Sequence, residues 1–235
     1  MKGLTLIRKD FQRNHLFSVG LFVLFFFIGS DGRTKDEILY VALGDSYTIG
    51  TGITPQVAWP SLLEKDLQAK GIPVRLVNNL ARAGWSSGDL WEGQLPQLRS
   101  LQPTFVTLLI GANDVVREVR QEDFSRHLKK ILDEIQEILP QKDHVVLLTI
   151  PDFSITPSGQ RFGSKQRDRI VLFNDIIVKE AKSRRLKVVD LFSISHKMGT
   201  DSSLLADDGL HPSFKAHAMW EKKIFPVVYE LFNSK

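Results

Sequence analysis

The sequence predicts an α/β fold, a three-layer α/β/α sandwich with helices on both faces of a parallel sheet. Short β-branched runs alternate along the chain with segments of helical apolar spacing, which is typical of a parallel sheet. Two of these runs, 104–110 and 144–150, are continuously apolar, as expected for strands buried on both faces. With 235 residues and 43% hydrophobic content, the chain is expected to form one domain with one core.

Five runs are expected to be strands, and four longer segments are expected to be helices. The strands are predicted at 38–43, 74–77, 104–110, 144–150 and 186–192. The helices are predicted at 59–71, 124–139, 166–185 and 213–232. The helix at 124–139 has a regular apolar stripe, made of Phe124, Leu128, Ile131, Ile135 and Ile138. Pro226 is expected to kink or break the last helix.

The N-terminal thirty residues differ from the rest of the chain. They carry four basic residues and one acidic residue, so they hold +3 of the net charge of +4. An apolar run of thirteen residues, 16–28, follows the basic stretch and is shorter than the ~20 residues that span a bilayer as a helix. Residues 1–30 are therefore expected to be a secretory signal peptide, or alternatively an uncleaved membrane anchor. A polar linker is expected at 31–37, and the protein is expected to be periplasmic or secreted.

Composition excludes several classes of function. The basic residues form no stripe with interleaved aromatics, so nucleic-acid binding is not expected. The chain has no cysteine, which excludes disulfides, metal-thiolate sites and a lipid-modified N-terminal cysteine. The glycines at 50–56 match neither the phosphate-binding loop nor the dinucleotide-binding spacing. No metal, cofactor or protein partner is implied.

Residues suited to catalysis follow the expected strands, where ligands bind in parallel α/β sheets. Ser46 follows the first strand, Gly84 the second and Asn113 the third, while Asp208 and His211 come after the fifth. Each has a plainer interpretation alone: a serine often caps a helix, and an asparagine or aspartate often shapes a turn. Their common position at strand ends favours a catalytic set.

These residue types together fit nucleophilic catalysis. A serine hydroxyl needs an adjacent base, which His211 supplies, and Asp208 can hold the imidazole in its productive tautomer. The N–H groups of Ser46 and Gly84 and the Asn113 amide are suitable donors to an oxyanion. Ser46, Asp208 and His211 are therefore the expected catalytic residues.

The four segments resemble the motifs of the GDSL, or SGNH, hydrolase superfamily. Gly44-Asp45-Ser46 matches its first block, Gly84 the second, "GAND" at 111–114 the third, and the Asp208–His211 pair the last. The resemblance runs from about residue 38 to near the C-terminus, and it implies a flavodoxin-like sheet in the order 2-1-3-4-5 without metal or cofactor. The carboxylates within the first and third blocks are expected to be structural. The α/β-hydrolase elbow Gly-x-Ser-x-Gly is absent, because no second glycine follows Ser46 at that spacing.

The expected substrate class rests on three short segments of the sequence. "ARAGWSS", "IPDFSITP" and "DGLHPS" resemble segments of bacterial lysophospholipase-like and acyl-esterase-like members, so an acyl or lysophospholipid-type ester is expected. Removal of acetyl groups from O-acetylated cell-envelope carbohydrate is the alternative reaction. A non-catalytic, membrane-tethered binding protein is the alternative of another class. The long loop 151–168 is expected near the site. The candidate acyl-pocket residues are Trp85, Phe153, Ile155 and Phe162.

Overall fold

The computed structural model describes residues 37–233, which form an α/β domain around a five-stranded parallel sheet. The strand order is β2-β1-β3-β4-β5, which confirms the predicted topology. The strands are β1 (Ile38–Gly44), β2 (Val74–Asn79), β3 (Phe105–Leu109), β4 (Val145–Leu148) and β5 (Lys187–Val189). Residues 1–30 and most of the expected linker lie outside the described residues.

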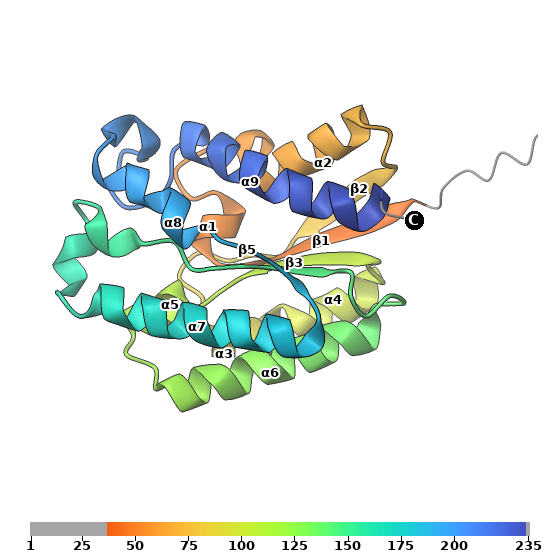
Figure 1. The fold of residues 1–235 in the computed structure, drawn as a ribbon, viewed down its shortest axis with the longest axis horizontal. Coiled ribbons are helices and arrows are strands. Elements are labelled where there is room, and N and C mark those ends of the chain that lie inside the picture. The colour runs from red at the N-terminus through yellow and green to blue at the C-terminus, as the bar shows by residue number, and fades with distance from the viewer. Residues whose placement is uncertain (1–36, 234–235) are drawn as a thin grey trace, which may run out of the picture. The chain divides into compact units, whose positions relative to one another are not determined.

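Helices cover both faces of the sheet, as predicted (Figure 1). One face carries α2 (Trp59–Ala69) and α9 (Phe214–Asn233), which contact each other. The other carries α3 (Ser87–Gly93), α4 (Leu95–Leu101), α6 (Gln121–Ile138) and α7 (Gln166–Arg184). The shorter helices are α1 (Ser46–Ile49), α5 (Ala112–Val116) and α8 (Phe192–Ser195). The 3-10 turns are η1 (Pro55–Val57), η2 (Phe153–Ile155), η3 (Gly159–Phe162), η4 (His196–Gly199) and η5 (Ser202–Leu204).

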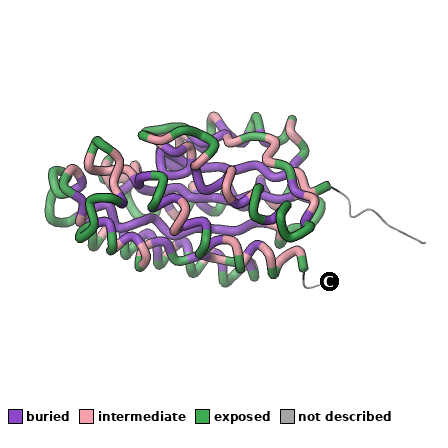
Figure 2. Tube along the Cα trace, turned by 90° about the horizontal axis from the view of Figure 1, so that it is seen from above, coloured by how far each residue is buried: buried purple, intermediate pink, exposed green. Residues whose placement is uncertain are grey.

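The core lies on both sides of the central strands. Every residue of β3 and β4 is buried, which explains why these runs are apolar without alternation. Figure 2 shows the strands as buried segments between partly exposed helices. Four members of the α6 stripe are buried, and Ile138 at its end is half-buried. The stripe therefore packs α6 onto the sheet, as the spacing predicted.

Pro226 does not break the last helix. It lies inside α9, which runs without interruption to Asn233. Proline removes one backbone donor, but Trp220, Ile224 and Val228 are buried on either side of it. Their packing against the rest of the domain holds the helix together across the proline.

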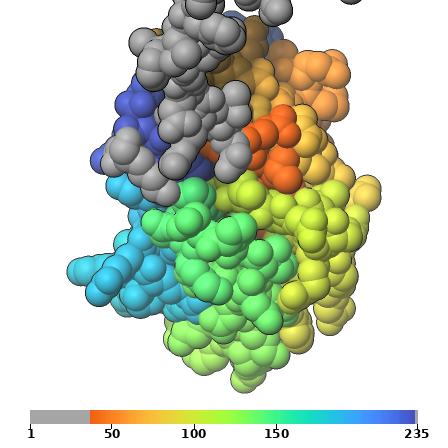
Figure 3. All heavy atoms as spheres, turned by 90° about the vertical axis from the view of Figure 1, so that its right-hand side faces the viewer, coloured from red at the N-terminus to blue at the C-terminus, as the bar shows by residue number. Residues whose placement is uncertain are grey.

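The carboxyl ends of the strands define one end of the domain, from which the loops that carry the candidate catalytic residues project. Figure 3 looks onto the opposite end, where the strands begin. Within residues 37–233, no helix is long and apolar enough to span a membrane.

Candidate active site

Ser46 is the first residue of α1 and is separated from the end of β1 by Asp45 alone. The carboxylate of Asp45 caps this helix by accepting a hydrogen bond from the N–H of Tyr47 at 3.0 Å. Capping is therefore the role of Asp45, and the expectation that this aspartate is structural agrees with the contact. Burial raises the pKa of Asp45 to about 7, helped by the nearby carboxylate of Asp114. Ser46 is 6% exposed and lines a surface pocket.

The turn before Ser46 requires glycine. A Cβ on Gly44 would lie 2.4 Å from the carbonyl oxygen of Leu109. The side chain of Gln94 bonds both backbone groups of Gly44: its Oε1 accepts from the N–H at 3.0 Å, and its Nε2 donates to the carbonyl at 2.7 Å. These contacts fix the point at which the chain leaves the sheet toward Ser46.

The candidate oxyanion residues are held together across two strand ends. Nδ2 of Asn113 donates to the carbonyl oxygen of Trp85 at 2.9 Å, which leaves its second N–H available. The buried Asp114 accepts from the N–H of Ser87 at 2.7 Å and from its hydroxyl at 2.5 Å. Burial raises the pKa of Asp114, although the bonds from Ser87 oppose that rise. The bond between Asn113 and Trp85 and the bonds between Asp114 and Ser87 therefore connect the loop that carries Gly84 to α5.

Asp208 and His211 form a hydrogen-bonded pair. Nδ1 of His211 lies 2.5 Å from Oδ2 of Asp208. The other carboxylate oxygen accepts from the N–H groups of Leu210 and His211, each at 2.9 Å. Partial burial opposes ionisation, but the bonds from His211 and these N–H groups hold the pKa of Asp208 below its usual value. An ionised carboxylate is thus fixed on the imidazole.

One pocket of about 160 Å³ brings most of the sequence-predicted residues together. Its lining is Ser46, Tyr47, Ala83, Gly84, Ala112, Asn113, Val116, Phe153, Phe162, Leu210 and His211. Asp208 is bonded to His211 but does not line the pocket itself. Within residues 37–233, no group of three or more His, Cys, Asp or Glu side chains is placed to hold a metal ion.

The family model for GDSL-like lipases and acylhydrolases matches residues 42–219, a span that includes every motif residue. The chain belongs to this family. It is therefore an ester hydrolase of the GDSL type.

Several curated relatives and solved structures resemble the chain over most of its length. An arylesterase of Vibrio mimicus is 28% identical over 83% of this chain and 88% of its own. Esterase TesA of Pseudomonas aeruginosa is 24% identical over 81% of this chain and 88% of its own. A crystal structure of TesA superposes with a TM-score of 0.66 at 22% identity, covering 81% of this chain and 97% of that one. The acetylxylan esterase Axe2 from Geobacillus stearothermophilus has the same score at 18% identity, with coverage of 81% and 94%.

Two candidate pocket residues of this GDSL hydrolase lie elsewhere. The ring of Trp85 lies over Gly93, where a Cβ would approach it to 2.4 Å. Because Gly93 has no side chain, the indole ring fits against α3 at this position, and it does not line the pocket of Ser46. Ile155 packs on Gly199 and lines a neighbouring pocket of about 650 Å³. Among the aromatic and aliphatic candidates, Phe153 and Phe162 alone line the pocket of Ser46.

The pocket also contains residues that sequence reasoning missed. Tyr47 and Leu210 are chain neighbours of Ser46 and His211, and Val116 follows Asn113 by nearly one helical turn. Chain adjacency and the three-residue spacing were the signals that could have found them. The ring of Tyr47 lies 5.5 Å from that of His211, so it packs directly beside the candidate base.

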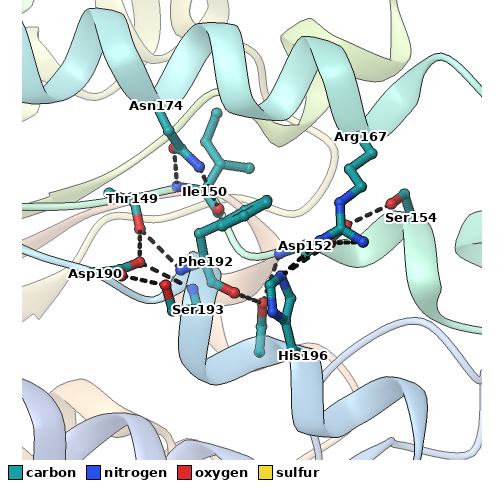
Figure 4. Close-up of polar contacts among 11 residues, drawn as sticks. Thr149, Ile150, Asp152, Ser154, Arg167, Asn174, Asp190, Phe192, Ser193 and His196 are labelled. Carbon is teal, nitrogen blue, oxygen red and sulfur yellow. Dashed lines mark hydrogen bonds and ion pairs between the residues drawn. The ribbon is translucent and has the colours of Figure 1, made fainter.

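The segment 151–168 is anchored at its base by the buried Asp152 (Figure 4). Its carboxylate lies 3.5 Å from Nη1 of Arg167 and 3.3 Å from Nε2 of His196, and it accepts from the hydroxyl of Ser154 at 2.5 Å. The segment is also tightly turned, because a Cβ on Gly159 would lie 1.8 Å from the carbonyl oxygen of Phe153. The pocket wall that Phe153 and Phe162 form is therefore a folded part of the domain.

Proposed function

We propose that this GDSL hydrolase cleaves carboxylic esters with an apolar acyl group, of the acyl or lysophospholipid type, through an acyl-serine intermediate on Ser46. The observation that carries the proposal is the pocket that Ser46 shares with His211, Gly84 and Asn113. Each of these residues has a type suited to one step of ester hydrolysis.

The proposed reaction begins when His211 takes the proton of the Ser46 hydroxyl as the oxygen attacks the ester carbonyl. Asp208 holds the imidazole through the 2.5 Å contact and stabilises the imidazolium that forms. The N–H groups of Ser46 and Gly84 and the free N–H of the Asn113 amide stabilise the oxyanion. His211 then protonates the leaving alcohol. In the second half, it activates the water that releases the acid and restores Ser46.

The lining of the pocket supports an apolar acyl group. Phe153, Phe162, Val116 and Leu210 contribute hydrocarbon beside Ser46. A shallow polar cleft lined by exposed arginines would instead suit a carbohydrate ester. Arg161 and Arg167 are both exposed, but neither lines this pocket. The pocket volume of about 160 Å³ accommodates the acyl carbons nearest the ester carbonyl.

Removal of acetyl groups from carbohydrate is the second candidate, because the 151–168 segment also contributes to a second pocket that has several polar side chains in its lining. Ser154, Gln160, Arg167 and His196 line this hollow of about 650 Å³, which is large enough for a sugar unit. The solved relative from Geobacillus stearothermophilus is described as an acetylxylan esterase. Acetylated oligosaccharides therefore belong in the substrate panel.

The deciding experiment measures hydrolysis of p-nitrophenyl acetate, butyrate, octanoate and palmitate by the full chain and by Ser46→Ala. We expect the variant to lose activity and the wild type to hydrolyse the butyrate, octanoate or palmitate ester faster than the acetate. Activity confined to acetate, together with release of acetate from acetylated oligosaccharides, would favour the second candidate. Equal hydrolysis by both proteins would remove Ser46 from the mechanism and indicate another nucleophile or a contaminating esterase. No hydrolysis by either folded protein would favour the non-catalytic binding protein.

We also propose that residues 1–30 direct export, from their charge and apolar run. Expression of the full chain followed by cell fractionation and N-terminal sequencing tests this. A mature chain beginning near residue 31 in the exported fraction would support a cleaved leader. An intact N-terminus in the membrane fraction would support an anchor, and an intact chain in the cytosol would contradict both.

A further inference from the structure

The Asp208–His211 pair lies on a loop whose tip is contacted from another part of the chain. Within the loop, the N–H of Ala206 donates to the carbonyl oxygen of His211 at 2.8 Å, and that of Gly209 donates to Ala206 at 3.0 Å. From outside, Ser158 donates its hydroxyl to the carbonyl oxygen of Asp208 at 2.6 Å and its N–H to that of Gly209 at 3.0 Å. Ser158 therefore holds both residues at the tip of the turn.

Ser158 belongs to the same folded segment as the aromatic wall of the pocket. It lies between Phe153 and Phe162, whose rings meet edge to face at 6.1 Å. Thr156 ties this segment internally, since its hydroxyl donates to the carbonyl oxygen of Phe153 at 2.8 Å and accepts from the N–H of Gly159 at 3.0 Å. The two bonds from Ser158 thus join the pocket wall to the loop of the candidate base.

We propose that Ser158 is a positioning residue that fixes the Asp208–His211 pair against the acyl-pocket wall. This inference rests on the proposed function and adds a residue to it. The hydroxyl bonds the backbone of Asp208 and not its carboxylate, so it sets where the pair lies. Ser158 does not line the pocket, so it acts on proton transfer and not on substrate binding. Proton transfer requires accurate placement of the base, so loss of the contact lowers kcat.

The test compares full-length wild type with Ser158→Ala, Ser158→Thr and Ser158→Val on p-nitrophenyl butyrate. We expect kcat to fall about tenfold in Ser158→Ala, with KM within about twofold of wild type. Ser158→Thr keeps the donor and should retain most of kcat, whereas Ser158→Val has nearly the same shape without the donor and should not. Ser158→Thr and Ser158→Val introduce side chains of similar size, so a difference between them reports on the hydroxyl and not on packing strain. Ser183→Ala removes an exposed hydroxyl that likewise donates to a backbone carbonyl oxygen, that of Glu180 in α7, and serves as the control.

A second readout follows the pair itself, through the low-field proton NMR signal of the short bond between His211 and Asp208. The signal should weaken or move upfield in Ser158→Ala and Ser158→Val, and persist in Ser158→Thr. Wild-type kcat with an unchanged signal in both variants that lack the hydroxyl would overturn the proposal. So would a raised KM with unchanged kcat, which would mean that Ser158 only shapes the pocket. Loss of activity in Ser46→Ala in the same assay would show that the proposed function stands in either case.

Discussion

The two halves of the candidate site are built differently. Ser46, Gly84 and Asn113 each follow a neighbouring strand of the sheet closely, and buried side chains tie these strand ends together. Asp208 and His211 come well after β5, beyond α8, η4 and η5, on a loop that bonds mainly to itself. The nucleophile half is thus fixed by the core, whereas the acid–base half is fixed by local hydrogen bonds and by Ser158.

Because of this difference, substitutions in the two halves should differ in how far they lower stability and how far they lower activity. Substitutions among the buried ties of the nucleophile half should affect folding as well as catalysis, because they leave polar groups without partners inside the core. Substitutions in the acid–base half should lower activity with little effect on folding, since the side chain of Asp208 is 42% exposed. Four substitutions, one or more in each half, test this contrast.

Asp208→Asn should have the largest effect, and it should lower activity with little effect on stability. An amide in place of the carboxylate favours the wrong tautomer of His211, so kcat should fall on the order of 10⁴-fold. The melting temperature should change little because the position is partly exposed. Asp207→Asn, at the exposed acidic neighbour, is the control. Steady-state kinetics on p-nitrophenyl butyrate within tenfold of wild type would remove Asp208 from the mechanism.

Asn113→Ala should lower kcat on the order of 10²–10³-fold, because one oxyanion donor is lost. It also removes the bond to Trp85, so thermal unfolding is measured alongside the kinetics. A modest loss of stability with this loss of kcat is the expected pair of results. Nearly full kcat in a folded variant would show that the amide takes no part in catalysis.

Ser87→Ala should instead act on folding. It removes the 2.5 Å bond to Asp114 and leaves a buried carboxylate oxygen without its donor. The free energy of unfolding should fall by about 1–3 kcal/mol, measured by urea denaturation. Ser100→Ala, which removes an exposed hydroxyl bonded to the backbone, should change it by less than about 0.5 kcal/mol. If the two variants were equally stable, the tie between α3 and α5 would contribute nothing measurable.

The smallest expected effect is a difference in the pH dependence of stability between the halves. Asp114 has a raised pKa when folded, so it contributes a loss of stability as pH rises above the unfolded value of 3.8. Asp208 has a lowered pKa, so its contribution is present above 3.8 and is lost as pH falls below that value. Asp114→Asn and Asp208→Asn should therefore change the slope of unfolding free energy against pH in opposite directions. Denaturant titrations from pH 3 to 6 measure both, and slopes that change in the same sense would contradict the assignment.

Much of the fold was predictable because each strand was short, apolar and separated from the next by a helical segment. The gathering of Ser46, Gly84 and Asn113 around one pocket was predictable for a related reason, because these residues follow strands that lie side by side in the sheet. The direction of loop side chains was not predictable. Trp85 turns toward α3 because Gly93 leaves room for its ring, and no local pattern near residue 85 records that gap.

Longer-range hydrogen bonds were equally hidden from the sequence. Ser158 lies 50 positions before the carbonyl group that it bonds, in a loop whose path depends on the whole domain. Pro226 is a simpler case, in which packing of buried neighbours outweighs a local preference.

The tight turn at Gly159 bears on how the enzyme meets aggregated substrate. In enzymes whose active site is covered by a mobile lid, opening of that lid can limit the rate. Here the wall of the pocket is folded onto itself at Phe153, anchored by Asp152 and bonded by Ser158 to the loop that carries Asp208 and His211. A wall held at three places is not expected to open as a lid when the enzyme meets a lipid–water interface. The rate should then follow the concentration of dispersed ester smoothly, without a jump at the concentration where micelles form.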